Sequence, residues 1–177
     1  QPNLYDRRDA WERVHAARVL AGPQWVPLAR SVLAQPACER DLELLVTFGG
    51  SDPLRSTERV LAELPAGLRV AVSIGEHMEA RRAAIAATAR HLAAELLPTG
   101  APLAPWMARA RAAVTALGTT LYELAYLGTP ALILANFTGD APVLARYGEL
   151  APFRALGLAS ELDGRTLAHA LAHERAA

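Results

Sequence analysis

The sequence contains a single cysteine, Cys38, and no apolar run that approaches the ~20 residues needed to cross a bilayer. One cysteine excludes an intrachain disulfide and a cysteine metal cluster. It also fits a reducing compartment, and no secretory signal is visible. We therefore expect a cytoplasmic protein without a membrane span.

Neither sign of charge is in excess, because 18 lysines and arginines balance 18 aspartates and glutamates. This balance argues against a general attraction to nucleic acid, although it leaves room for a local basic pocket that holds a diphosphate. The 177 residues are 52% hydrophobic and 20% charged, which is typical of one soluble globular domain with its own core. The first residues, Gln-Pro-Asn-Leu-Tyr-Asp, look like the continuation of a preceding segment, so we expect this chain to be a piece of a longer protein.

Short apolar runs alternate with longer amphipathic segments along the chain. This alternation predicts an α/β fold, a Rossmann-like three-layer α/β/α arrangement with a mostly parallel sheet. In the alanine-rich stretch 83–97, helix could instead continue through the proposed strand. The expected strands are residues 17–20, 42–48, 68–74, 94–97, 112–116 and 131–135. The expected helices are residues 26–33, 53–64, 79–90, 103–109, 119–127, 141–147 and 165–175.

A buried strand at 42–48 runs into Gly49-Gly50, and a helix is expected to start near Ser51 to Pro53. A glycine turn between a strand and a helix brings free backbone N–H groups and the positive end of the helix dipole to one point, which suits a phosphate. Glycine lets the anion approach the backbone without meeting a Cβ. Many such turns carry glycine for geometry alone, so this signal is weak by itself.

A second glycine turn follows the strand at 112–116, where Gly118 precedes Thr119 and Thr120. One interpretation is a capping box in which Thr120 and Glu123 satisfy backbone donors at the helix start. In the other, the amides and hydroxyls of residues 118–120 bind phosphate and Glu123 accepts hydrogen bonds from a ribose diol, since a carboxylate offers two acceptors to two donors. The residues alone leave both open.

In a parallel sheet of this class, ligands bind beyond the carboxyl ends of the strands. The polar and glycine-bearing positions of this sequence follow predicted strands, and we expect them to line one cleft at that edge. They are residues 49–52, 75–77, 99–106, 117–120 and 136–140.

These motifs resemble a known family, the PseG and SpsG proteins. PseG proteins are UDP-sugar hydrolases of pseudaminic acid biosynthesis, and SpsG proteins are their spore-coat polysaccharide relatives. The resemblance covers about residues 17 to 160. It is carried by residues 48–53 (Phe-Gly-Gly-Ser-Asp-Pro), 118–124 (Gly-Thr-Thr-Leu-Tyr-Glu-Leu), 127–130 (Leu-Gly-Thr-Pro) and 20–25 (Leu-Ala-Gly-Pro-Gln-Trp).

The resemblance implies the GT-B architecture shared with MurG-type glycosyltransferases, in which two Rossmann-like domains hold a nucleotide sugar between them. Residues 1–22 would be the crossover from a missing N-terminal domain, and residues 23–177 the nucleotide-sugar-binding domain. The implied partners are a UDP-sugar and that missing domain, without nucleic acid. The implied reaction hydrolyses the sugar–diphosphate bond of a UDP-2,4-diacetamido-2,4,6-trideoxyhexose, and it needs neither a metal nor another cofactor.

The resemblance also implies roles for individual residues. One group of residues would face the diphosphate, a second group would face the uracil, and Glu123 would bind the ribose. The first group is Gly49, Gly50, Ser51, Gly118, Thr119 and Thr120. The second is Ile74, Gly75, Leu103 and Trp106. Asp52 has two interpretations from the residues alone: it orients Ser51 or contacts substrate, or, as an aspartate before Pro53, it belongs to an ordinary helix start.

The sequence departs from the family at places that matter for catalysis. The family's proposed catalytic histidine lies in a Gly-x-Gly-His-type loop of the first domain, and this chain has no such loop. After the strand at 131–135 the family carries an Asp-Asn-Gln-like segment, of which Asn136 is the candidate remnant; the glutamine is missing, so Asn136 is a weak catalytic candidate. Leu117 stands where a glycine is usual. Because half of the cleft would be absent, the isolated domain is expected to bind UDP weakly and to turn over little or nothing.

Two other functions stay open on the sequence: half of a GT-B glycosyltransferase, and a degenerate, non-catalytic nucleotide-sugar-binding or interaction module. Other candidate residues favour structural roles. His169 and His173 are four residues apart but lack a third ligand, so a solvated helix face is the expected setting. The arginines at 81, 82, 109 and 111 are expected on solvated faces as well.

Overall fold

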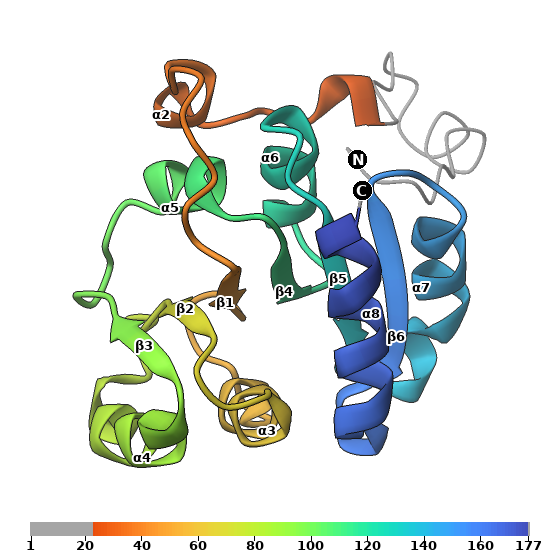
Figure 1. The fold of residues 1–177 in the computed structure, drawn as a ribbon. Helices are drawn as coiled ribbons and strands as arrows, with labels where there is room; N and C mark the ends of the chain where they lie inside the picture. The colour runs from red at the N-terminus through yellow and green to blue at the C-terminus, as the bar shows by residue number, and fades with distance from the viewer. Residues whose placement is uncertain (1–22, 177) are drawn as a thin grey trace.

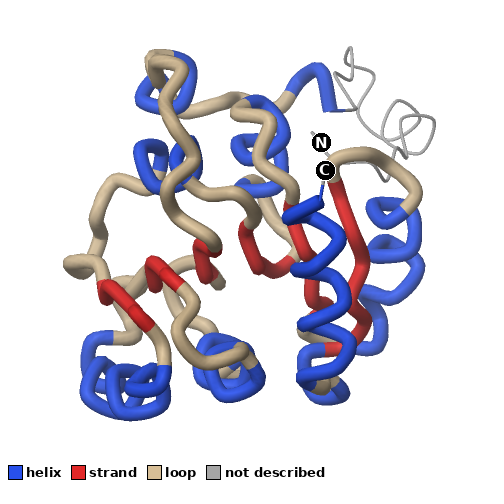
Figure 2. Tube along the Cα trace, viewed as in Figure 1, coloured by secondary structure: helices blue, strands red, loops and turns tan. Residues whose placement is uncertain are grey.

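The computed structural model describes residues 23–176, which form an open sheet of six parallel strands between two layers of helices (Figures 1 and 2). The strands are β1 (Leu44–Thr47), β2 (Arg69–Val72), β3 (Ala93–Leu96), β4 (Ala113–Ala116), β5 (Ala131–Ala135) and β6 (Phe153–Leu158). The α-helices are α2 (Arg30–Leu33), α3 (Ser56–Glu63), α4 (Arg82–Thr88), α5 (Ala104–Arg109), α6 (Thr120–Tyr126), α7 (Ala141–Gly148) and α8 (Gly164–Ala176). Short 3₁₀ turns are η1 (Pro23–Trp25), η2 (Glu79–Arg81), η3 (Ala89–His91), η4 (Thr138–Asp140) and η5 (Ala159–Glu161).

The central strands are apolar on both faces because both faces of the sheet are covered. All residues of β1 and of β5 are buried. Along β1, Leu44 and Val46 belong to one core cluster and Leu45 to the other. The first cluster packs under α3, α4 and α8, and the second under α5, α6 and α7, so alternate side chains of each strand meet different helices.

The strand order β3-β2-β1-β4-β5-β6 contains one reversal. The chain runs outward from β1 to β3, returns through α5 to lay β4 beside β1, and then runs outward in the other direction to β6 (Figure 1). The reversal falls between β1 and β4. In doubly wound sheets, the carboxyl ends of the strands at such a switch point flank the crevice in which ligands bind.

The predicted fold class is confirmed, and the sheet is wholly parallel. Each predicted strand within residues 23–176 has a counterpart, including the doubtful one at 94–97, which is β3. The prediction at 17–20 and the proposed crossover segment 1–22 lie outside the described residues. Strand β6 was not predicted. It is a half-buried edge strand that contains Arg154 and Gly157, so it lacks the apolar run on which the strand predictions relied.

Two predicted helices are wrong at their starts. The helix expected at 26–33 shrinks to α2, because a residue before proline disfavours helical backbone and Pro27 lies inside the predicted span. The helix expected from residue 53 starts at Ser56, since Asp52 and Arg55 both have positive φ angles, 42° and 55°. No helix within residues 23–176 is long and apolar enough to cross a membrane.

Candidate functional site

Two loops leave the sheet side by side at the switch point. We call residues 48–52, which follow β1, the β1 loop, and residues 117–120, which follow β4, the β4 loop. The parallel pairing of β1 with β4 sets Thr47 opposite Thr115, so both loops emerge at the same carboxyl edge. The sequence prediction that these two glycine turns face one edge of the sheet therefore agrees with the strand register.

The backbone of both loops offers free hydrogen-bond donors. Gly49, Gly50, Gly118 and Thr119 are all exposed. Their amide N–H groups donate no hydrogen bond to any residue within the described range 23–176. Four unpaired amides on two adjacent loops can bind the oxygens of an anion.

The glycines at 50 and 118 are not required by the fold. A Cβ built on either would meet no atom of the described residues within 4 Å, and neither residue has a positive φ angle. Gly49 differs, because its φ of 76° is a conformation that other residues rarely adopt. Open space beside Gly50 and Gly118 lets a ligand come close to the backbone.

The segment that follows β2, residues 75–81 (the β2 segment), packs directly against the β1 loop. A Cβ at Gly75 would overlap with the carbonyl oxygens of Gly49 and Gly50, so only glycine fits there. The amide of His77 donates to the carbonyl oxygen of Gly50 at 2.9 Å. Gly75 also has a contact within its own segment, since its amide donates a hydrogen bond to Met78 Sδ at 3.4 Å.

Asp52 holds the start of α3. Its Oδ1 accepts from the amide of Ser56 at 2.8 Å, and its Oδ2 accepts from the amide of Thr57 at 2.9 Å. The residue is 3% exposed. Of the two interpretations of Asp52, the structure realises the helix start: its carboxylate caps α3 inside the fold, which leaves exposed Ser51 as the polar side chain of the loop.

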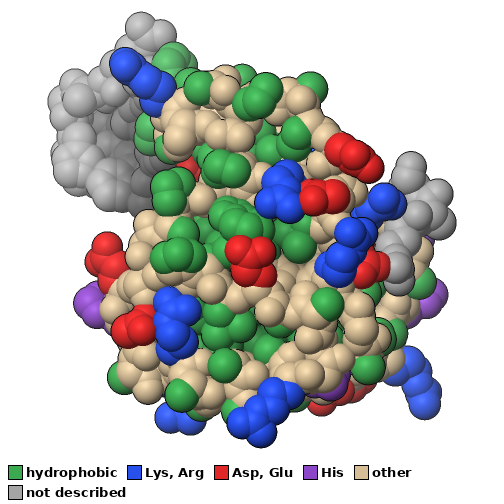
Figure 3. Space-filling view, turned by 60° about the vertical axis from the view of Figure 1, so that its left-hand side comes forward, with side chains coloured by type: hydrophobic (Ala, Val, Ile, Leu, Met, Phe, Trp, Pro, Cys, Tyr) green, Lys and Arg blue, Asp and Glu red, His purple; other side chains and the backbone are tan. Residues whose placement is uncertain are grey.

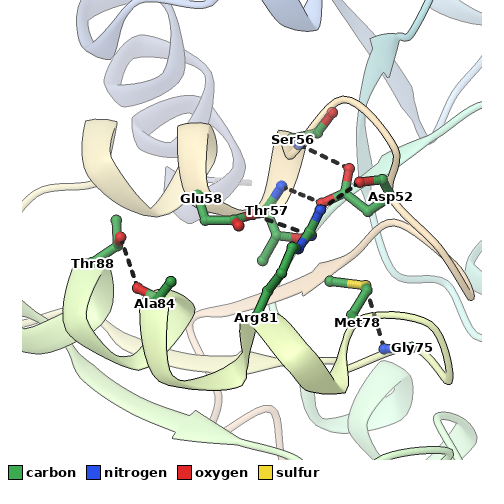
Figure 4. A network of polar contacts seen from close by, with 9 residues as sticks. All are labelled: Asp52, Ser56, Thr57, Glu58, Gly75, Met78, Arg81, Ala84 and Thr88. Carbon is green, nitrogen blue, oxygen red and sulfur yellow. Dashed lines mark hydrogen bonds and ion pairs between the residues drawn. The ribbon is translucent and has the colours of Figure 1, made fainter.

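Arg81 lies against Asp52 from the neighbouring helix (Figure 4). Its Nη1 donates to the main-chain oxygen of Asp52 at 2.8 Å, and its Nη2 to Oδ2 of Asp52 at 3.2 Å. Nη2 also donates to Glu58 Oε2 at 3.3 Å. The expectation that Arg81 lies on a solvated face is wrong, because only 19% of its side chain is exposed.

The other three arginines also have partners within the chain. Arg82 binds Glu79, and Arg109 binds Asp41 and stacks on Trp106 at 5.0 Å. Arg111, which is exposed as expected, donates to the main-chain oxygen of Arg40. On the face seen in Figure 3, basic and acidic side chains of the described residues are interspersed.

The start of α6 carries no capping box. Neither threonine side chain caps the helix, and the first turn is closed by the amides of Leu121 and Tyr122, which donate to Gly118 and Thr119. Of the two interpretations of Thr120 and Glu123, the structural one is therefore not realised. Thr119 is exposed and Thr120 half-buried, and Glu123 lies one turn into the helix.

Glu123 is half-buried on α6, and burial raises its pKa above the ordinary value of 4.5. A hydrogen bond from the amide of Ala29 opposes this shift. One backbone donor leaves most of the acceptor capacity of the carboxylate unused. A partly desolvated carboxylate with free lone pairs is well suited to bind hydroxyl donors such as a diol.

We expect Glu123→Gln to raise the melting temperature by about 2 °C at pH 7, because the amide carries no charge to desolvate. Since the folded-state pKa of Glu123 is raised, the folded protein binds its proton more readily than the unfolded chain does. The penalty is therefore present above the raised pKa and disappears as the pH falls towards 4.5. Thermal melts of both proteins between pH 7 and pH 4 measure this difference. A variant less stable than the parent at pH 7 would contradict it.

The remaining predicted site residues are placed less directly. Ile74 is 1% exposed within the core under α3 and α4, so only its backbone could contact a ligand. Leu103 and Trp106 are half-buried at the start of α5 and pack on the opposite core. Asn136 is half-buried directly after β5, at the same carboxyl edge as the two loops.

In comparisons with known proteins, no protein-family model matched the chain and no curated protein matched it significantly.

Histidines and acidic residues do not assemble a metal site. Within residues 23–176, no group of three or more histidine, cysteine, aspartate or glutamate side chains is placed to hold an ion. His173, on α8, instead accepts a hydrogen bond at Nδ1 from Arg154 Nη2 at 2.8 Å. This agrees with a structural role for the pair His169 and His173.

A separate cavity of about 330 Å³ lies at the opposite, amino edge of the sheet. It is lined in part by Cys38, Arg40 and Tyr126. Arg40 is already engaged, since its Nη2 donates to the carbonyl oxygen of Leu127 at 2.8 Å and its Nη1 to Thr129 Oγ1 at 2.7 Å. No motif in the sequence indicated this cavity, and its arginine stabilises the fold.

Proposed function

We propose that this chain is the nucleotide-sugar-binding domain of a PseG-like UDP-sugar hydrolase. The β1 and β4 loops would hold the diphosphate between them. The observation that carries the proposal is the pair Gly50 and Gly118, two exposed glycines at the switch point with unpaired amides and no packing reason to be glycine. This is what a backbone-lined anion site requires.

In this proposal, the amides of residues 49–50 and 118–119 and the hydroxyls of Ser51 and Thr119 donate to phosphate oxygens. Glu123 accepts from the ribose hydroxyls, and its burial strengthens those hydrogen bonds. The uracil lies towards the backbone of Ile74 and Gly75 and the start of α5 at Leu103, with Trp106 behind it.

The chemical step would be hydrolysis of the sugar–diphosphate bond. Water attacks the sugar carbon, the bond to the diphosphate oxygen breaks, and the charge that grows on the departing diphosphate is stabilised by the same loop amides that bound it. A base that takes the proton from water would come from a preceding domain. Asn136, beside the β4 loop, would orient the sugar.

A non-catalytic binding module is the second candidate, and one observation favours it. Leu117, where the family has glycine, is half-buried and packs against the second core cluster. A side chain at this position would hinder the close approach of a phosphate to the backbone of the β4 loop. A glycosyltransferase half would use the same nucleotide contacts. It is distinguished by product analysis of the full-length protein with and without candidate acceptors.

Isothermal titration with UDP, UMP and CMP tests the proposal. We expect UDP to bind most tightly, and Glu123→Ala to weaken it by about tenfold or more, because hydrogen bonds to a charged group are lost. Ser51→Ala should weaken it by about fivefold. Each variant has a control outside the site. The control for Glu123→Ala is Glu149→Ala, which removes an exposed glutamate after α7, and the control for Ser51→Ala is Thr88→Ala, which removes a hydroxyl that bonds to Ala84 on α4.

The controls should leave UDP binding unchanged, and UDP should raise the melting temperature of the parent protein because it binds only the folded state. Absence of binding by all three nucleotides, with no change in melting temperature, would contradict the proposal.

A further inference from the structure

The β1 loop is held in place by the neighbouring β2 segment as well as by its own residue Asp52. Three contacts tie it to the β2 segment: the packing of Gly75 on the carbonyls of Gly49 and Gly50, the hydrogen bond from His77, and the two donations from Arg81 to Asp52. Arg81 is the one side chain among them, and it comes from 29 residues further along the chain.

Arg81 contacts a stretch of backbone that adopts unfavourable conformations. Asp52 and Arg55 both adopt left-handed conformations that residues other than glycine rarely take. Asp52 is bound through both its carbonyl and its carboxylate, so Arg81 fixes the backbone and the cap together (Figure 4). A bidentate guanidinium is suited to this task, whereas a lysine could reach only one of the two oxygens at a time.

The buried polar cluster of Asp52, Ser56, Thr57, Glu58 and Arg81 is not expected to add much to the free energy of unfolding. Within the described part of the chain, four of its buried polar atoms have no hydrogen-bond partner: Ser56 Oγ, Thr57 Oγ1, Glu58 Oε1 and Arg81 Nε. Buried ion pairs of this kind are often no more stable than apolar side chains of the same size. A role in holding a particular loop conformation explains the cluster better than a gain in stability does.

We propose that Arg81 is a positioning residue for phosphate recognition: through Asp52 it holds the β1 loop in the conformation that presents the amides of Gly49 and Gly50 to the ligand. This inference rests on the proposed function, because it concerns the same diphosphate site. Arg81 itself need not touch the ligand.

The test compares Arg81→Met with Arg154→Met, using UDP and uridine as probes. Arg154 is a matched control because it also forms an ion pair with a largely buried glutamate, Glu174, but it lies at the amino end of β6. We expect Arg81→Met to weaken UDP binding about tenfold while uridine affinity changes less than twofold, since uridine has no phosphate. Arg154→Met should change neither affinity.

Amide hydrogen exchange of His77 supplies a readout that needs no ligand, because this amide donates to Gly50. We expect exchange at His77 to be at least tenfold faster in Arg81→Met than in the parent or in Arg154→Met. Arg81→Lys, which keeps the charge but not the two-point contact, should shift both readouts in the same direction, and it serves if Arg81→Met does not fold.

The outcomes separate the two proposals. An unchanged UDP-to-uridine affinity ratio together with unchanged exchange at His77 would overturn the positioning role. Lower thermal stability with an unchanged ratio would also overturn it, since Arg81 would then be structural only. If the parent protein binds no UDP, the proposed function fails. Exchange at His77 then decides alone whether Arg81 holds the loop.

Discussion

Gly75→Ala is expected to lower the free energy of unfolding by about 1–3 kcal/mol and to abolish most UDP binding. The added methyl group would overlap with the carbonyl oxygens of Gly49 and Gly50, which are backbone atoms and cannot rotate away as a side chain can. The β1 loop must therefore move as a unit. Its movement would also break the hydrogen bond from His77 to Gly50 and turn the loop amides away from the β4 loop.

Urea denaturation and titration with UDP measure the two effects on Gly75→Ala. The control is Glu149→Ala, which changes an exposed residue after α7, outside the segments that line the candidate site. Unchanged stability and unchanged UDP affinity in Gly75→Ala would show that the β1 loop adjusts freely and that its packing against the β2 segment does not matter.

Gly50→Ala and Gly118→Ala, unlike Gly75→Ala, should weaken UDP binding without lowering the stability of the fold. Both methyl groups enter open space, so we expect changes in stability of less than about 0.5 kcal/mol. UDP affinity should fall by about tenfold in each variant, because a Cβ would hold the phosphate away from the amides and lengthen their hydrogen bonds. The double variant should lose detectable binding.

The same titrations and melts apply, and Glu149→Ala again serves as the control, since Glu149 follows α7 and belongs to neither loop. UDP binding that survives unaltered in the double variant would place the nucleotide elsewhere. Binding lost together with stability would mean that the two glycines serve the fold after all.

The sheet was predictable because its strands are short apolar runs. β1 and β5 are buried along their whole length, and such segments are recognisable without tertiary information. β6 is half-buried and interrupted by Gly157, so its strand character depends on pairing with β5, which no local pattern records. The start of α3 was misplaced for a similar reason. Asp52 and Arg55 before it are left-handed, and Asp52 is held by Arg81, which lies 29 residues further along the chain.

The location of the candidate site was also predictable in outline, because polar residues after parallel strands must gather at one edge. The internal design of the site was not. Asp52 and Arg81 are far apart in the sequence, and Arg81 in isolation resembles any solvated helix arginine. The space beside Gly50 and Gly118 and the burial of Glu123 depend on neighbours brought together by the strand order.

The stability and function of this domain are expected to oppose one another at Glu123. Removing the charge in Glu123→Gln should stabilise the protein at neutral pH, and it should weaken ribose binding because an amide is a weaker acceptor than a carboxylate. A residue kept solely for folding would show no such opposition.

The most direct test of the account is an NMR titration of the isotope-labelled chain with UDP, following the backbone amides. The account predicts that Gly50 and Ser51 in the β1 loop and Gly118 and Thr119 in the β4 loop shift together with one dissociation constant. Shifts confined to one loop, or centred on the cavity beside Arg40 at the opposite edge of the sheet, would contradict a shared diphosphate site.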